Sequence, residues 1–185
     1  MAETDSLLKR LVSTFTLDFA AWVLGTAVQT ARPLQSELPG TTVAVDQVFQ
    51  VTLANDRELL LHLEFQGRGS HEPMPWRMLE YMTRLAHLHR LDLESVVLYI
   101  GRGAGTDDTG IYQVNGLDGT PVLAWRYRVI RLWQMQAEEL MAARQVAPLA
   151  LLGQTQIAQP EVILPAVVTR IRSVGDVALR GHLLA

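Results

Sequence analysis

The sequence predicts a single α/β domain with a mixed central sheet flanked by helices. Two adjacent runs, 43–53 and 58–66, alternate apolar and polar residues with the period of two that is typical of strands. A helical pattern precedes these runs, and a second helical pattern and a buried strand follow them. The order is therefore helix, two or three antiparallel strands, helix, strand, with further elements behind.

The elements around this hairpin are indicated by their apolar spacing and by their ends. A helix is expected over 4–24, where Gly25 offers a stop. An irregular strand is expected over 28–38, broken by Pro33. A helix is expected over 75–90, because Pro75 suits a first helical turn. A buried strand is then expected over 95–100.

The second half of the chain is predicted to add smaller elements to this core. We expect a loop over 101–110, strands near 111–114 and 123–132, and helices over 135–144 and 162–174, with a last turn or two over 176–184. We expect residues 1–155 to form the α/β core. Residues 156–185 are then a helical extension packed on the core or on a partner.

Composition narrows the class of protein. The 185 residues are 49% hydrophobic and 19% charged, as in globular domains, and the mean hydropathy of +0.14 favours a partner or an oligomer interface such as a homodimer. The absence of cysteine excludes disulfides and thiolate zinc sites and suits a cytoplasmic location. The apolar stretch 7–24 contains three charged residues, so we expect neither a membrane span nor a membrane partner. The net charge of −3 excludes a broad basic surface, so any DNA contact must be local and weak or transient.

The apolar alternation also predicts how the two strands pair. Matching the apolar faces sets Leu53 opposite Leu59 across a three-residue loop, Asn55-Asp56-Arg57. This register sets Asp46 opposite Gln66 and brings Asp46, Glu64 and Gln66 to one face of the hairpin.

Two interpretations of this face stay open. Mg²⁺ and Mn²⁺ prefer oxygen ligands, and Mg²⁺ commonly takes one or two carboxylates and keeps water for the rest, so Asp46 and Glu64 could hold such an ion for phosphodiester hydrolysis. Gln66 could ligate or orient but cannot act as a general base. The alternative is that all three are polar residues on the solvent face of an antiparallel hairpin.

Several motifs resemble one nuclease family. Asp46 and the run Leu61-His62-Leu63-Glu64-Phe65-Gln66 are similar to the D…(I/V)E(I/F)Q pattern of the recombination-promoting nuclease/putative transposase family, within the PD-(D/E)XK superfamily. The segments 5–9, 74–81 and 97–101 resemble its opening helix, its helix after the third strand and its next core strand. The resemblance covers roughly 4–155. It implies a restriction-endonuclease-like αβββαβ core, with Asp46 and Glu64 as metal ligands and Gln66 in the place of the superfamily lysine.

Further residues are candidates at the edge of this site. The resemblance implies that Arg77 and Tyr81 are auxiliary residues facing the site or the phosphate, whereas Arg77 and Arg84 are otherwise surface charges of a helix. Asp5 is either a metal ligand from the first helix or a helix cap. His62 lies either at the edge of the site or on the solvent side of its strand.

The sequence therefore leads to two hypotheses about function. The first is a metal-dependent DNA endonuclease of the recombination-promoting, transposase-like type, with Mg²⁺ or Mn²⁺ as cofactor and DNA as partner. The second is a catalytically inactive binding or assembly module on the same fold, which the acidic charge and the apolar C-terminal third favour.

Overall fold

A computed structural model describes most of the chain. The parts outside the description are residue 1 and the ranges 35–44, 69–72, 177–179, 182 and 184–185. For residues 2–6 only the backbone is described.

A five-stranded mixed sheet forms the centre of the molecule, in the order β1-β2-β3-β4-β7. β1, β2 and β3 are antiparallel neighbours, whereas β4 runs parallel to β3 and β7 runs parallel to β4. The strands span Val28–Pro33 (β1), Gln47–Leu53 (β2), Glu58–Gln66 (β3), Leu93–Tyr99 (β4) and Arg128–Arg131 (β7). The predicted α/β class with a mixed, helix-flanked sheet is confirmed.

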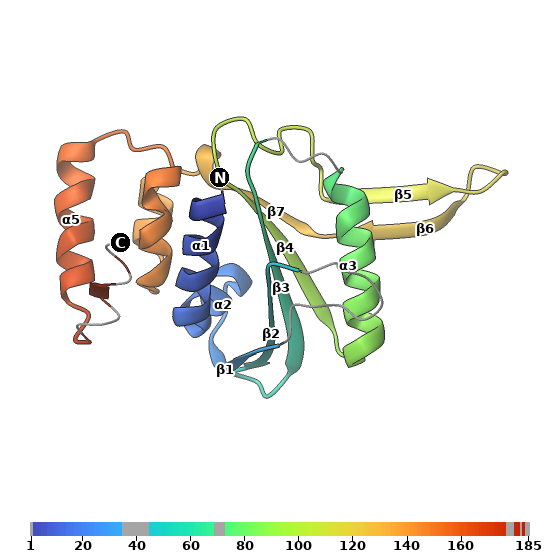
Figure 1. Cartoon of the computed structure of the whole chain (residues 1–185), viewed down its shortest axis with the longest axis horizontal. Coiled ribbons are helices and arrows are strands. Elements are labelled where there is room, and N and C mark those ends of the chain that lie inside the picture. The colour runs from blue at the N-terminus through green and yellow to red at the C-terminus, as the bar shows by residue number, and fades with distance from the viewer. Residues whose placement is uncertain (1, 35–44, 69–72, 177–179, 182, 184–185) are drawn as a thin grey trace.

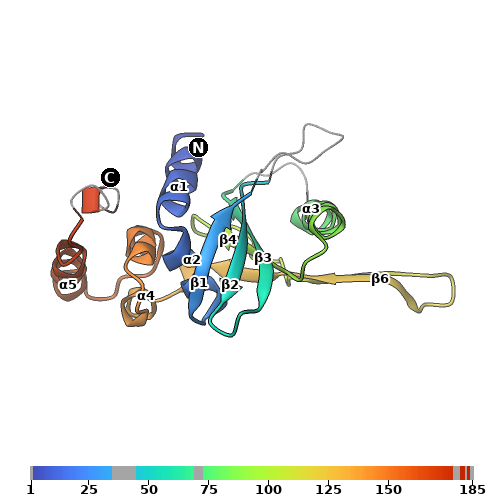
Figure 2. The ribbon, with the colours of Figure 1, turned by 90° about the horizontal axis from the view of Figure 1, so that it is seen from below.

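Helices cover both faces of this sheet. Figure 1 shows α1 and α2 on one side and α3 on the other, and Figure 2 shows the same layers from below. The helices span Ala2–Thr14 (α1), Thr16–Leu24 (α2), Met74–His89 (α3), Ala137–Ala142 (α4) and Pro160–Arg172 (α5), with 3₁₀ turns over Leu132–Gln134 (η1) and Ala147–Gln154 (η2). No helix within the described part of the chain is long and apolar enough to cross a membrane.

Each face of the sheet has its own hydrophobic core. Phe49, Leu61 and Leu63 pack with α1, α2 and the C-terminal helices, and the buried side chains of α5 belong to this cluster. On the opposite face, Leu60 and Val97 pack beneath α3. Alternate side chains of β3 therefore enter two different cores, and a polar residue on either face is placed inside the protein.

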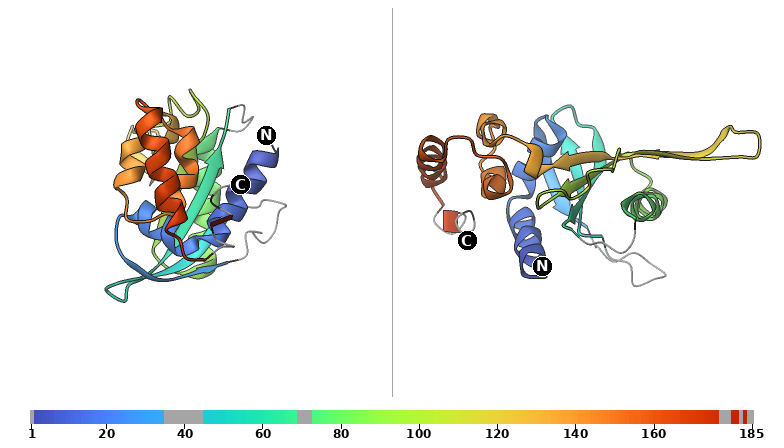
Figure 3. Two further views of the ribbon diagram at one scale, coloured as in Figure 1. Left: turned by 90° about the vertical axis from the view of Figure 1, so that its left-hand side faces the viewer. Right: turned by 90° about the horizontal axis from the view of Figure 1, so that it is seen from above.

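A two-stranded ribbon projects from the molecule beyond α3 (Figure 3). It consists of β5 (Ile111–Asn115) and β6 (Pro121–Arg126), paired antiparallel. Aromatic rings tie its base to the core: Trp125 lies against Trp76 of α3 and stacks on Tyr112. Trp125 also donates a hydrogen bond from Nε1 to the Pro75 carbonyl at 3.0 Å. The base of the ribbon is thus fixed to the start of α3.

Most predicted elements are confirmed, and the differences lie at local breaks. The single helix expected over 4–24 is two helices separated at Phe15, and the strand expected over 123–132 is β6 and β7, separated at Tyr127. α2 does end at Gly25, which has a φ of 67°. Part of the strand expected over 28–38, the start of the run 43–53, and much of 176–184 lie outside the described residues.

Candidate functional site

The β2–β3 hairpin has the predicted parity but a register shifted by two residues. Val51 pairs with Leu59 and Phe49 with Leu61, so the pairing of Leu53 with Leu59 is wrong. The turn uses Ala54-Asn55-Asp56, because the Leu53 N–H donates to the Arg57 carbonyl at 2.9 Å and Asp56 takes a φ of 63°. Parity depends on the apolar pattern, whereas register also depends on this turn.

The shift brings Asp46 beside Glu64 instead of opposite Gln66. The Asp46 N–H donates to Glu64 Oε1 at 3.0 Å, and the Phe65 N–H donates to Asp46 Oδ2 at 2.8 Å. Asp46 lies just before β2, and its side chain is 14% exposed, against 1% for Glu64. Two carboxylates from neighbouring strands are thus held together by the backbone itself.

Arg77 of α3 connects this pair to Gln66. Its Nη2 donates to Glu64 Oε2 at 3.0 Å and its Nη1 donates to Gln66 Oε1 at 2.8 Å. Its Nε reaches the hydroxyl of Tyr81 at 3.4 Å, one turn along the same helix. Burial, followed by the charge of Glu64, raises the pKa of Tyr81, although its hydrogen bond with Arg77 opposes the rise. Asp46, Glu64, Gln66, Arg77 and Tyr81 therefore lie together as predicted candidates.

Asp46 is paired with a cation that the sequence had not assigned to the site. Lys9 reaches it from α1, with Nζ 2.7 Å from Asp46 Oδ1. The backbone of Asp5 lies in the same helix, but its side chain is outside the described residues, so its role as a ligand stays a prediction. Arg84 binds Glu80 on its own helix at 2.6 Å.

His62 and Ser95 extend the cluster into the core. His62 is fully buried beside Glu64, so the prediction of a solvent-side residue is wrong. Its Nε2 lies 3.2 Å from Glu64 Oε1 and its Nδ1 lies 3.2 Å from the Ser95 hydroxyl. The tautomer with hydrogen on Nε2 satisfies both contacts, because His62 then donates to Glu64 and accepts from Ser95. Ser95 of β4 thus orients His62, and His62 holds Glu64.

The closeness of Glu64 perturbs Asp46. Burial raises the pKa of Asp46, and the nearby charge of Glu64 raises it further, while Lys9 and the Phe65 N–H oppose the rise. Lys9 and Arg77 supply positive charge at the two carboxylates. The face is therefore a buried, charged site and not the solvent face of a hairpin.

The oxygen atoms of the cluster are of the type that a hard divalent cation prefers as ligands. Asp46 and Glu64 offer carboxylate oxygens, and the ammonium at Asp46 Oδ1 marks a position that favours a positive charge. No group of three or more histidine or acidic side chains suited to a metal occurs among the described residues. An ion here would take two carboxylates and fill its other positions with water, as Mg²⁺ commonly does.

Only indirect signals in the sequence pointed to the site residues that were not predicted. Val48 and Leu60 share the face of Glu64, and two such apolar residues indicate a covered face. Lys9 stands in the opening helix that carries part of the family resemblance. Ser95 had no signal, because its contact with His62 depends on the pairing of β3 with β4.

Comparison with known proteins adds no relative, since no protein family, curated protein or solved structure matches this chain significantly.

Proposed function

We propose that this chain is a metal-dependent DNA endonuclease of the recombination-promoting, transposase-like type. The observation that carries the proposal is the carboxylate pair of Asp46 and Glu64, joined by the hydrogen bond from the Asp46 N–H and bordered by Lys9 and Arg77. A cleaving site needs such a charged cluster within reach of solvent, and the 14% exposure of Asp46 provides that access.

The order of elements supports the same proposal. A helix, three antiparallel strands, a helix and a parallel fourth strand follow one another as α2-β1-β2-β3-α3-β4. This order is compatible with the αβββαβ core of the PD-(D/E)XK superfamily. The resemblance adds support through Asp46, the acidic residue before β2, and the Glu64-x-Gln66 run of β3.

Each residue of the cluster has a role in this proposal. A Mg²⁺ or Mn²⁺ ion held by Asp46 and Glu64 would supply activated water and charge neutralisation at the phosphate. Arg77 fixes the orientation of Glu64 and Gln66 through two separate hydrogen bonds. Lys9 neutralises Asp46 in the resting protein through an ion pair of 2.7 Å, and its side chain is 37% exposed.

The test compares two glutamates on the same face of β3. Glu64→Gln should reduce Mn²⁺-dependent cleavage of plasmid and oligonucleotide DNA to background, because it removes the charge of a ligand. Glu58→Gln is the matched control, since Glu58 has the same parity as Glu64 but lies at the exposed start of the strand. Cleavage by Glu64→Gln at the rate of the unchanged protein would contradict the assigned site.

A second candidate function has its own supporting observation. All four carboxylate oxygens of Asp46 and Glu64 already have partners within the chain. A site closed in this way also suits a catalytically inactive binding or assembly module. Calorimetric titration with Mn²⁺ separates the two: binding that Asp46→Ala abolishes supports the nuclease, whereas no heat of binding and no cleavage support the module.

A further inference from the structure

A cavity of about 750 Å³ adjoins the carboxylate cluster and shares Gln66 with it. It lies where β3 and β4 end and α3 begins, and its walls include Arg68, Met74, Tyr99, Asp107 and Tyr112. Its volume is within the usual range of small-molecule sites. Crevices at the carboxyl ends of parallel strands commonly bind ligands.

The far wall of the cavity is held rigidly by Asp108. This buried carboxylate accepts hydrogen bonds from the hydroxyls of Tyr99, Tyr112 and Tyr127 at 2.5, 2.7 and 2.8 Å and from the Gly110 N–H at 2.9 Å. We call these three tyrosines and Asp108 the tyrosine cage. The cage holds the loop 101–110 against β4 and β5, so this wall of the cavity is fixed by hydrogen bonds.

Gly105 completes this wall by lying directly against Tyr99. A Cβ atom at this position would be 2.4 Å from the ring, and the φ of 64° also favours glycine. These contacts hold the glycine-rich loop 101–110 against β4.

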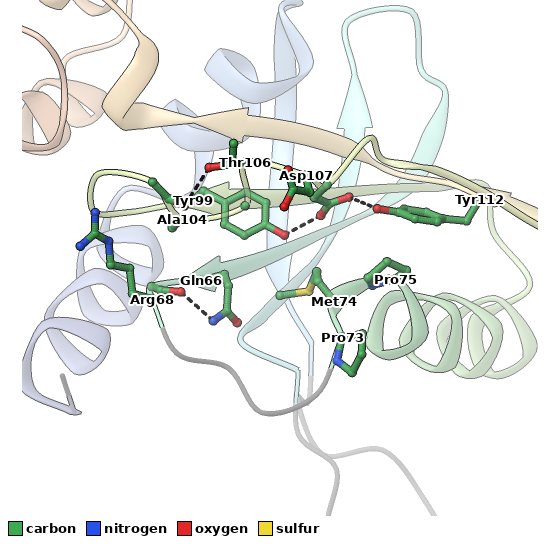
Figure 4. A pocket seen from close by; sticks show the side chains of 14 residues that line it. Gln66, Arg68, Pro73, Met74, Pro75, Tyr99, Ala104, Thr106, Asp107 and Tyr112 are labelled. Atoms are coloured by element: carbon green, nitrogen blue, oxygen red, sulfur yellow. Dashed lines mark hydrogen bonds between the residues drawn. The ribbon is translucent and has the colours of Figure 1, made fainter.

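Two charged side chains at the cavity are not committed to other groups. Arg68 and Asp107 are exposed and form no hydrogen bond or ion pair with any residue that the structure describes. In Figure 4 Arg68 lies at one end of the cavity and Tyr112 at the other, with Gln66 and Tyr99 between them. The cation is thus on the side of Gln66, which belongs to the carboxylate cluster.

This arrangement matches the chemistry of one nucleotide. A guanidinium binds a phosphate oxygen, an aromatic and thioether wall takes the flat face or edge of a base, and a carboxylate accepts from an exocyclic amino group. A base that is paired in a duplex has this edge occupied, so only an unpaired or extruded base can enter.

We propose that the cavity binds one unstacked nucleotide of DNA beside the phosphodiester that the cluster cleaves, with Arg68 on its phosphate and Asp107 on the amino group of adenine or cytosine. The inference rests on the proposed nuclease function. It makes single-stranded or locally unpaired DNA the substrate class.

Binding is measured in EDTA, so that cleavage does not enter the result. Fluorescence anisotropy with labelled oligonucleotides of about 12 nucleotides should show single strands bound about tenfold more tightly than the same sequence as a duplex. An oligonucleotide with abasic sites should bind as weakly as the duplex. Free dAMP should compete only weakly, since it lacks the neighbouring phosphates.

Two substitutions test the assigned contacts. Arg68→Ala should weaken binding of every single strand about tenfold, whereas Arg57→Ala, which removes an exposed arginine at the opposite end of β3, should have little effect. Asp107→Ala should remove the preference for oligo-dA and oligo-dC over oligo-dT, because thymine has no exocyclic amino group. If Asp107 had only a structural role, Asp107→Ala would leave this preference unchanged.

The outcomes separate this inference from the nuclease proposal. Metal-dependent cleavage together with equal binding of single strands, duplexes and abasic strands would overturn the nucleotide site and leave the nuclease. Selective binding of single strands without cleavage in Mn²⁺ would overturn the nuclease and support the site. Binding of dAMP as tight as that of the oligonucleotide would show a site for free nucleotides and overturn its role beside a phosphodiester.

Discussion

Two buried carboxylates in this molecule, Glu64 and Asp108, are stabilised in opposite ways. Glu64 is balanced by charge, because Arg77 lies 3.0 Å from one oxygen, and His62 and a backbone N–H contact the other. Asp108 is balanced by the hydroxyls of the tyrosine cage and by one N–H, with no ion pair to its side chain among the described residues.

These two environments suit the carboxylates to different roles. Burial and the hydrogen bond to Asp108 raise the pKa of Tyr99 and of Tyr127, so both stay protonated donors, and the cage has no second carboxylate within it. The Glu64 cluster instead sets two like charges side by side and raises the pKa of Asp46. Perturbed carboxylate pairs of this kind are common at functional sites, whereas the cage has the features of a structural joint.

The greatest loss of stability is expected when the tyrosine cage is disrupted. Asp108→Ala should lower the free energy of unfolding by about 3 kcal/mol, because three phenol hydroxyls and one N–H lose a charged acceptor. Chemical denaturation at pH 7 measures the change. Asp107→Ala is the matched control and should change stability by less than about 0.5 kcal/mol, since that side chain is exposed. Similar losses of stability in the two variants would show that Asp108 is no more important for stability than its exposed neighbour Asp107.

A smaller loss is expected where the loop meets Tyr99. Gly105→Ala should cost about 2 kcal/mol, from the left-handed backbone and from the contact with the ring. Gly101→Ala separates these causes, because Gly101 has a φ of 81° but open space around its Cβ position. Thermal denaturation should therefore rank Gly105→Ala below Gly101→Ala, and the reverse order would argue against a rigid cavity wall.

In the charged cluster of Asp46 and Glu64, removing a carboxylate charge should stabilise the protein instead of destabilising it. The folded pKa of Asp46 is above its unfolded value, so the folded protein binds more protons in that window and loses stability as pH rises through it. Asp46→Asn cannot ionise and should be more stable than the unchanged protein by about 1 kcal/mol at pH 7. The gain should disappear as pH falls below about 4, the unfolded aspartate value.

Asp118 provides the control for this pH dependence. Hydrogen bonds from Thr120 lower its pKa, so Asp118→Asn should give no gain at pH 7. Denaturation curves measured from pH 3 to pH 7 compare the two variants. A loss of stability in Asp46→Asn at neutral pH would mean that the Asp46 carboxylate stabilises the folded protein, as the Asp108 carboxylate does.

The smallest change in stability is expected at Lys9. Lys9→Met should alter the free energy of unfolding by less than about 0.5 kcal/mol, because the side chain is 37% exposed and its ion pair is screened by solvent. The same change should tighten Mn²⁺ binding in calorimetry, because the cation at Asp46 Oδ1 is removed. Arg10→Met, at the exposed neighbouring position, should leave Mn²⁺ affinity unchanged. Equal affinities in all three proteins would exclude competition between Lys9 and the metal.

The sequence predicted local elements well and their long-range contacts poorly. The bounds 58–66 of β3 were predicted correctly, because its alternation and its flanking turn residues are local signals. The register of the hairpin was missed by two residues, since the left-handed Asp56 moved the turn. Lys9 and Ser95 come to the cluster from other elements, and no pattern within their own segments predicts their contacts with Asp46 and His62.

The position of β3 between β2 and β4 has a consequence for the order of folding. The antiparallel hairpin can pair from local contacts alone, whereas β4 pairs only after the chain has crossed over through α3. Loop closure must precede such parallel contacts, which makes them slow to form. We therefore expect the carboxylates of Asp46 and Glu64 to meet early, in the hairpin, and Ser95 and Arg77 to reach them only when the crossover is complete. On this expectation the charged cluster is assembled late, after the sheet has gained its parallel strands.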